Sequence, residues 1–153
     1  MFRRVFAISV ALLLMLPMVS AAEDAGYIHI ESVVMTFDGA DANIIVEYSV
    51  DNLFAKLYMW LLGPDVIKQN LESTFADFQI QIVEISCDEA VIIASDVMTY
   101  NNGRYYVGPH QLGQSVDTLV ITFPDDYTIT LRSVDAIPSL AHTSYTAFYM
   151  ILL

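Results

Sequence analysis

Short segments of alternating apolar and polar residues, separated by turn residues, recur along most of the chain. Residues 27–37 and 43–50 are rich in β-branched and aromatic side chains and flank the turn sequence DGAD, which predicts a β-hairpin. In residues 43–50 every second side chain is apolar, as in a strand with one buried face and one face in water. The chain therefore offers a pair of half-buried strands before any helix.

Three further hairpins are predicted, because strand-like segments meet at recognisable turns. The turns are an acidic bend at Asp88, Asn-Gly at 102–103, which is typical of a type I′ turn, and Pro-Asp-Asp at 124–126. The strand-like segments around them are 77–86, 89–100, 104–107, 117–123 and 127–134. Residues 139–153 fit a final strand better than a short helix, because Thr, Tyr and Phe dominate most of this segment.

Residues 53–62 predict a helix that is apolar on every side. The sequence LFAKLYMWLL carries a single charge, and Gly63-Pro64 ends the helical pattern. About ten residues of helix span only ~16 Å, roughly half of a hydrocarbon core, so this segment is too short to cross a membrane. Because a helix that is apolar all round is normally buried all round, we expect it to cover the core.

A second helix is predicted to open at Pro64. Ile67, Leu71 and Phe75 recur at four-residue spacing, which gives one apolar face. Two strands, two helices and then further strands indicate an α+β fold. We expect an antiparallel, hairpin-rich β-sheet of about six to eight strands, with the two consecutive helices packed on one face.

Residues 1–22 predict a secretory signal peptide, because two arginines precede an apolar run and small residues lead up to Ala22. Pro17 interrupts the run before it reaches the ~20 residues that a membrane span needs. We expect cleavage near Ala22, with retention as an anchor as the alternative, and a single α+β domain over residues 23–153. The predicted location is secreted or extracytoplasmic, in the cell envelope or the extracellular space.

The predicted mature chain is strongly acidic and also rich in apolar residues. Without residues 1–22, which hold two arginines and no acid, 131 residues remain with 18 acidic and four basic side chains, a formal charge of −14. This balance argues against nucleic acid as a partner, since phosphate binding needs a basic patch, and it disfavours anionic membrane surfaces. The whole chain is 56% hydrophobic, which indicates a thick core or a buried interface.

Cys87 is the only cysteine, so an intramolecular disulfide is excluded. A lone thiol between strand-like segments is usually a small buried hydrophobe, and we expect burial here. The alternative is a disulfide between two chains.

The sequence holds no recognisable reactive centre. His29, His110 and His142 have no Cys or Glu at metal-ligand spacing, and we expect each to be exposed or satisfied by a neighbour. The adjacent acids at 88–89 and 125–126 stand at turns, where we expect them to be solvated. No catalytic residue, metal ion or cofactor is therefore predicted.

Two surfaces are candidate binding sites. One sheet face and one neighbouring helix leave part of an apolar helix uncovered, and that part would meet a protein or the outer leaflet of a bilayer. The hairpin NNGRYYVGPH presents tyrosine and arginine, which are common in binding hot spots, although one of two adjacent tyrosines on a strand must face inward. The candidate residues are Phe54, Tyr58, Trp60, Arg104, Tyr105, Tyr106 and His110.

These patterns favour an exported, acidic, non-enzymatic domain that acts by protein association at the cell envelope or in the extracellular space. The partner would be a second copy of the chain or an envelope protein. One alternative is a carrier of a small apolar ligand, with its cavity between the helices and the sheet. A hydrolase is the third hypothesis.

Overall fold

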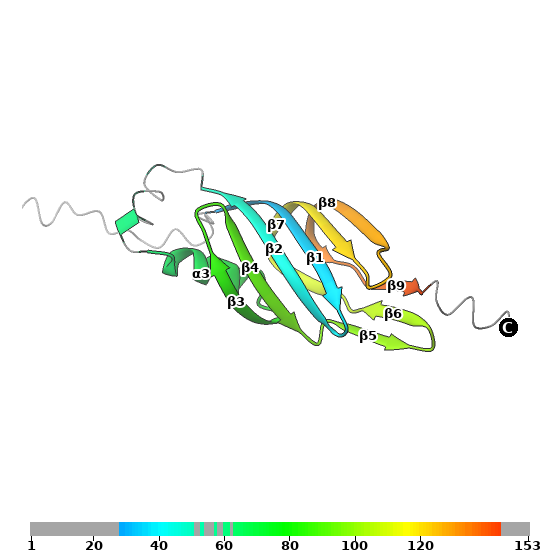
Figure 1. The fold of residues 1–153 in the computed structure, drawn as a ribbon. Coiled ribbons are helices and arrows are strands. Elements are labelled where there is room, and N and C mark those ends of the chain that lie inside the picture. The colour runs from blue at the N-terminus through cyan, green and yellow to red at the C-terminus, as the bar shows by residue number, and fades with distance from the viewer. Residues whose placement is uncertain (1–27, 51–52, 54–56, 58–59, 62, 145–153) are drawn as a thin grey trace, which may run out of the picture.

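The computed structural model describes residues 28–50, 53, 57, 60–61 and 63–144 (Figure 1). The predicted signal peptide lies outside the described residues. In the described part, 62% of the residues are in strands and 13% are helical. The described part of the protein is therefore mostly β. It has two sheets and one α-helix whose full length is described, α3 (Asp65–Thr74).

Six strands form the larger sheet, in the order β3-β4-β2-β1-β7-β8. Neighbouring strands are antiparallel except β1 and β7, which are parallel. The hairpins β1–β2, β3–β4 and β7–β8 all confirm pairings that the alternating segments predict. The strands are β1 (His29–Asp38), β2 (Asp41–Ser49), β3 (Gln79–Ile85), β4 (Glu89–Ser95), β7 (His110–Thr122) and β8 (Thr128–Ile137).

Three short strands form the second sheet, β5 (Met98–Asn101), β6 (Arg104–Val107) and β9 (Leu140–Thr143). The Asn-Gly signal is confirmed as the β5–β6 turn, where Asn102 and Gly103 have φ values of 50° and 77°, the sign that a type I′ turn requires. β9 pairs with β6, so a strand is confirmed for residues 140–143. Residues 145–153 lie outside the described part.

The core lies on one face of the larger sheet, where the side chains at alternate positions of β2 are almost completely buried. Ile67, Leu71 and Phe75 of the α3 segment join the same hydrophobic cluster, which confirms the predicted apolar face of this helix. Val107 of β6 and Met98 of β5 belong to it as well. The second sheet and α3 therefore share one core with the larger sheet.

Gly113 allows the close approach of α3 to β7. A Cβ atom on Gly113 would collide with the main-chain oxygen of Ser73 and would lie 3.0 Å from its carbonyl carbon and 3.1 Å from Thr74 Cα. Beside this contact, the Gln114 side-chain amide donates a hydrogen bond to Thr74 Oγ1 at 3.2 Å. The C-terminal end of α3 is thus fixed on the sheet by backbone proximity and by a polar contact.

The expectation of an α+β fold with two consecutive helices packed on one sheet face is wrong. Only α3 packs on the sheet as a described helix, and the described residues of the predicted helix 53–62 point to solvent. The prediction placed all strands in one sheet, which left one face for two helices to cover. The second sheet occupies part of that face instead and adds Met98 and Val107 to the core, whereas none of Leu53, Leu57, Trp60 and Leu61 belongs to it.

Candidate functional site

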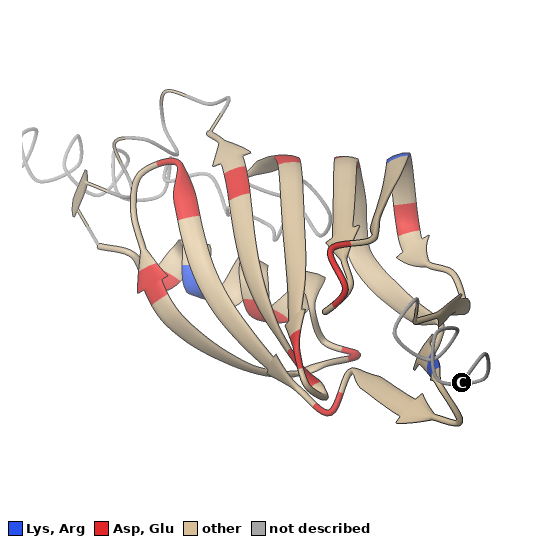
Figure 2. Ribbon diagram, turned by 45° about the vertical axis from the view of Figure 1, so that its right-hand side comes forward, with Lys and Arg blue, Asp and Glu red and all other residues tan. Residues whose placement is uncertain are grey.

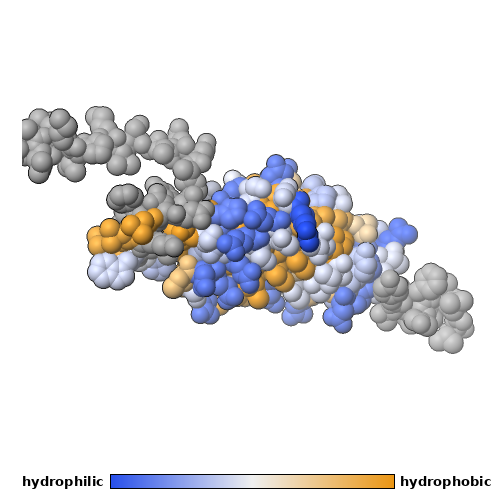
Figure 3. All heavy atoms as spheres, turned by 90° about the horizontal axis from the view of Figure 1, so that it is seen from above, coloured by the Kyte–Doolittle hydropathy of each residue, from blue (hydrophilic) through white to orange (hydrophobic). Residues whose placement is uncertain are grey.

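The described residues of segment 53–61 form an exposed apolar stripe. Leu53, Leu57, Trp60 and Leu61 have helical backbone conformation, and their spacing of four, three and one residues places them on one helical face. Their exposed fractions run from 56% at Leu57 to 81% at Trp60. Figure 3 shows apolar side chains at the end of the molecule where this segment lies. Exposed apolar patches of this kind mark association sites.

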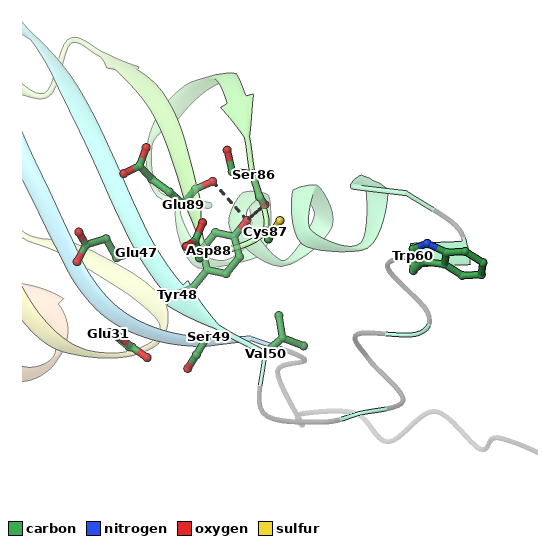
Figure 4. A pocket seen from close by; sticks show the side chains of 10 residues that line it. All are labelled: Glu31, Glu47, Tyr48, Ser49, Val50, Trp60, Ser86, Cys87, Asp88 and Glu89. Carbon is green, nitrogen blue, oxygen red and sulfur yellow. Dashed lines mark hydrogen bonds between the residues drawn. The ribbon is translucent and has the colours of Figure 1, made fainter.

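A pocket of about 870 Å³ lies beside this apolar stripe, at the end of the larger sheet (Figure 4). Three parts of the fold line it: the start of β1, the end of β2 and the β3–β4 turn. Trp60 also lines the pocket. It stands apart from the other lining residues, and Val50 lies between Trp60 and Tyr48 in this view. The lining residues are Glu31, Glu47, Tyr48, Ser49, Val50, Trp60, Ser86, Cys87, Asp88 and Glu89.

Tyr48 fixes the shape of the pocket by anchoring the β3–β4 turn. Its hydroxyl donates a hydrogen bond to the carbonyl oxygen of Ser86 at 2.7 Å, and its main-chain N–H donates to the carbonyl oxygen of Asp88 at 2.9 Å. Burial raises the pKa of Tyr48 to about 12, with a smaller contribution from the charge of Asp88. The phenol therefore stays protonated and acts as a donor, and it is unsuited to serve as a base at neutral pH.

The pocket is acidic. Glu31, Glu47, Asp88 and Glu89 contribute carboxylates, and none of its described lining residues is a lysine or an arginine. Glu47 and Glu89 are direct partners across the β2–β4 pair, an arrangement of like charges that destabilises a sheet. Figure 2 shows the wider pattern, with acidic residues on several strands and turns and few basic ones. The pocket therefore favours a cationic group over an anion.

Cys87 is exposed in this pocket, so the expectation of a buried thiol is wrong. β3 ends at Ile85 and β4 begins at Glu89, which places Cys87 in the short connection and not within a strand. Its side chain points away from the core because the turn itself lies outside the sheet.

Of the predicted residues on the apolar helix, Trp60 reaches the pocket, whereas Phe54 and Tyr58 lie outside the described residues. The rest of the pocket was not predicted. Its carboxylates come from segments far apart in the sequence, and each one alone reads as an ordinary polar position on a strand or turn. The Glu47–Glu89 pairing becomes visible only once the β2–β4 register is known.

The second predicted cluster is divided between the two sheets. Arg104 and Tyr106 are exposed on β6, while Tyr105 is partly buried against the core, which confirms that one of the two tyrosines faces inward. His110 lies on β7 and stacks on Phe78 with ring centres 4.3 Å apart. The hairpin therefore offers arginine and tyrosine on its surface, without the histidine.

His142 forms an interior pair that the sequence reading missed. Its Nε2 atom lies 2.8 Å from Asp125 Oδ2, and the two side chains are only 10% and 11% exposed. Tyr127 stacks on the imidazole with ring centres 4.2 Å apart. The expectation of a solvated Asp125 is wrong, because β9 of the second sheet brings His142 to the β7–β8 turn.

The other two histidines lie elsewhere. His29 Nε2 lies 2.9 Å from Oδ2 of the exposed Asp117, and the His110 ring packs on Phe78. Among the residues that the structure describes, no three His, Cys, Asp or Glu side chains gather in a way that would hold a metal ion. Within the described part of the chain, no helix is long and apolar enough to cross a membrane. No family model, curated protein or solved structure matches the chain.

Proposed function

We propose that this protein is an exported domain that works by binding another protein through the apolar stripe Leu53, Leu57, Trp60 and Leu61. The observation that carries the proposal is the exposure of four large apolar side chains on one helical face, none of which belongs to the hydrophobic core. Burying such side chains contributes roughly 1.5–3 kcal/mol each, and Trp is common at interface hot spots. A partner that covers the stripe gains this energy.

The acidic lining of the pocket supports protein association over the carriage of a small apolar ligand. The face of the sheet beneath α3 is filled by side chains such as Leu71 and Phe75, both with no exposed surface. The pocket lies at strand ends and carries four carboxylates. An apolar ligand would have to displace water from these carboxylates without replacing their hydrogen bonds.

Site-specific photo-crosslinking in the cells that make the protein tests the proposal. A photoreactive phenylalanine analogue replaces Trp60 in one version, Tyr106 on β6 in a second and Thr130 on β8 in a third. All three positions are exposed, so the substitutions leave the core intact. We expect a discrete covalent adduct with another protein from position 60 and none from position 130. An adduct from position 106 alone would move the interface to the β5–β6 hairpin and contradict the proposal.

Trp60→Ser gives the complementary test. Trp60 is 81% exposed, so we expect its replacement to change the free energy of unfolding by no more than about ±0.5 kcal/mol, as for a neutral surface substitution. The complex recovered from the cells should be lost at the same time. A variant that keeps the complex would show that the stripe is not the contact.

A further inference from the structure

We propose that the docking segment of the partner is a cationic amphipathic helix, whose apolar face covers the stripe and whose lysine or arginine side chains enter the acidic pocket. This inference rests on the proposed function and adds the chemical class of the partner. Trp60 is the link, because it belongs to the exposed stripe and also lines the pocket (Figure 4).

The pocket has the composition that a long cationic side chain needs. Val50 and Trp60 offer apolar surface for the methylene stem of lysine or arginine, and the indole face attracts a cation. Glu31, Glu47 and Glu89 supply carboxylates for charged ends, and those of Glu47 and Glu89 lie on the far side of Tyr48 from Trp60 (Figure 4), where they would meet a second cationic side chain of the same helix. A concave site lined by one sign of charge also concentrates the opposite charge, which speeds encounter with a basic partner.

The placement of Glu47 opposite Glu89 is a separate observation that favours a cation. Like charges on directly opposed strand positions reduce the stability of the free sheet. A cation from the partner would relieve that repulsion, so part of the cost that the free protein carries is recovered on binding. Positions that reduce stability in this way are expected at sites selected for binding.

A second copy of the chain fits less well than a basic partner. Each predicted mature copy carries a formal charge of −14. Of the described cations, Lys68 already pairs with Glu72 on α3, Arg104 lies on β6 of the second sheet, and Arg132 lies on β8 at the edge of the larger sheet. Two copies would therefore bring acidic surfaces together, and like charges across an interface oppose association.

Fluorescence of the exported protein with synthetic helices tests the inference. Trp60 is the only tryptophan of the chain, so its emission reports directly on the stripe. The probes are three peptides without aromatic residues that share one leucine face and carry lysine, glutamine or glutamate on the other face. We expect the lysine peptide to shift the Trp60 emission to the blue and to saturate, and the glutamine peptide to bind at least about threefold more weakly.

Two double variants separate a specific pocket from the general acidity of the protein. Glu47→Gln with Glu89→Gln removes the opposed carboxylates, and should weaken the lysine peptide about three- to tenfold without affecting the glutamine peptide. Asp38→Asn with Asp126→Asn removes the same charge at turns on the opposite end of the sheet. This control should change the affinity less than twofold, because its charges lie beyond the screening length at moderate salt.

The inference is overturned if the glutamine peptide binds as tightly as the lysine peptide, or if both double variants weaken the lysine peptide equally. A protein adduct from position 60 with no response to the lysine peptide would retain the proposed function and remove only the cationic partner. Saturation by a second copy of the protein, measured as a doubled mass with adducts between identical chains, would replace the basic partner with self-association.

Discussion

Tyr48 illustrates how one side chain links the fold to the pocket. Its hydroxyl holds the carbonyl oxygen of Ser86 at 2.7 Å, and burial raises its pKa to about 12 from the usual 10. In the unfolded chain the phenol ionises near pH 10, while in the folded protein it keeps its proton. Between pH 10 and 12 unfolding therefore releases a proton, and the contribution of Tyr48 to stability is lost as pH rises through this window.

Comparison with Tyr48→Phe isolates this effect from the other titrating groups. At neutral pH the variant loses one part-buried hydrogen bond, and we expect it to be about 1 kcal/mol less stable. As pH rises from 10 to 12, the difference in free energy of unfolding between the two proteins should shrink, because only the protein with Tyr48 carries the buried phenol. Denaturant unfolding of both proteins across this range gives the measurement. A difference that stays constant would show that Tyr48 ionises as freely as an exposed tyrosine.

Glu47 and Glu89 lead to a prediction of increased stability, whereas Tyr48→Phe is predicted to reduce it. Because the two carboxylates are opposed across β2 and β4, Glu89→Gln should raise the free energy of unfolding by about 0.2–1 kcal/mol at low salt. The gain should shrink in high salt as the repulsion is screened. Thermal unfolding at two salt concentrations checks this, and a loss of stability on substitution would mean that the pair is held together by favourable contacts.

At the scale of elements, the contact between α3 and β7 depends on a missing side chain. Gly113→Ala would place a methyl group against the main chain of Ser73 and Thr74, and neither can move without shifting the helix end. We expect a loss of about 1–3 kcal/mol. Gly108→Ala is the matched control, because its Cβ meets only the His110 ring at 3.9 Å. Chemical denaturation of both variants measures the difference, and equal stability would contradict the close packing.

The hairpins could be predicted from sequence because each depends on local information. Alternation in β2 fixes which side chains face inward, and Asn102-Gly103 supplies the positive φ values of its turn. The helix prediction for 53–62 used equally local information, but burial is decided by the rest of the chain. Whether an apolar helix is covered depends on what else occupies the face of the sheet, and here the second sheet takes part of it.

At the scale of the whole molecule, the arrangement of the sheets depends on contacts between distant segments. β7 pairs in parallel with β1 across 86 residues, as in the pair Ile30 and Val116, and no local pattern encodes that choice. The same holds for the pocket, which combines residues of β1, β2 and the β3–β4 turn with Trp60. The sequence therefore indicated one member of the site, Trp60, and gave no signal for the carboxylates that surround it.

The pair of Asp125 and His142 joins the two sheets, and we expect it to couple their stabilities. Asp125 belongs to the β7–β8 turn of the larger sheet, His142 belongs to β9 of the smaller one, and the contact is almost excluded from water. A double-mutant cycle with Asp125→Ala and His142→Ala should give a coupling energy of about 1–3 kcal/mol. The chain supplies its own control in His29 and Asp117, which lie 2.9 Å apart but are 46% and 57% exposed, so their coupling should stay below about 1 kcal/mol.

Hydrogen exchange should show faster opening of β6 and β9 in Asp125→Ala than in Asp117→Ala, because only the first removes a contact between the sheets. Equal coupling energies for the two pairs would mean that the second sheet is held by its apolar contacts alone.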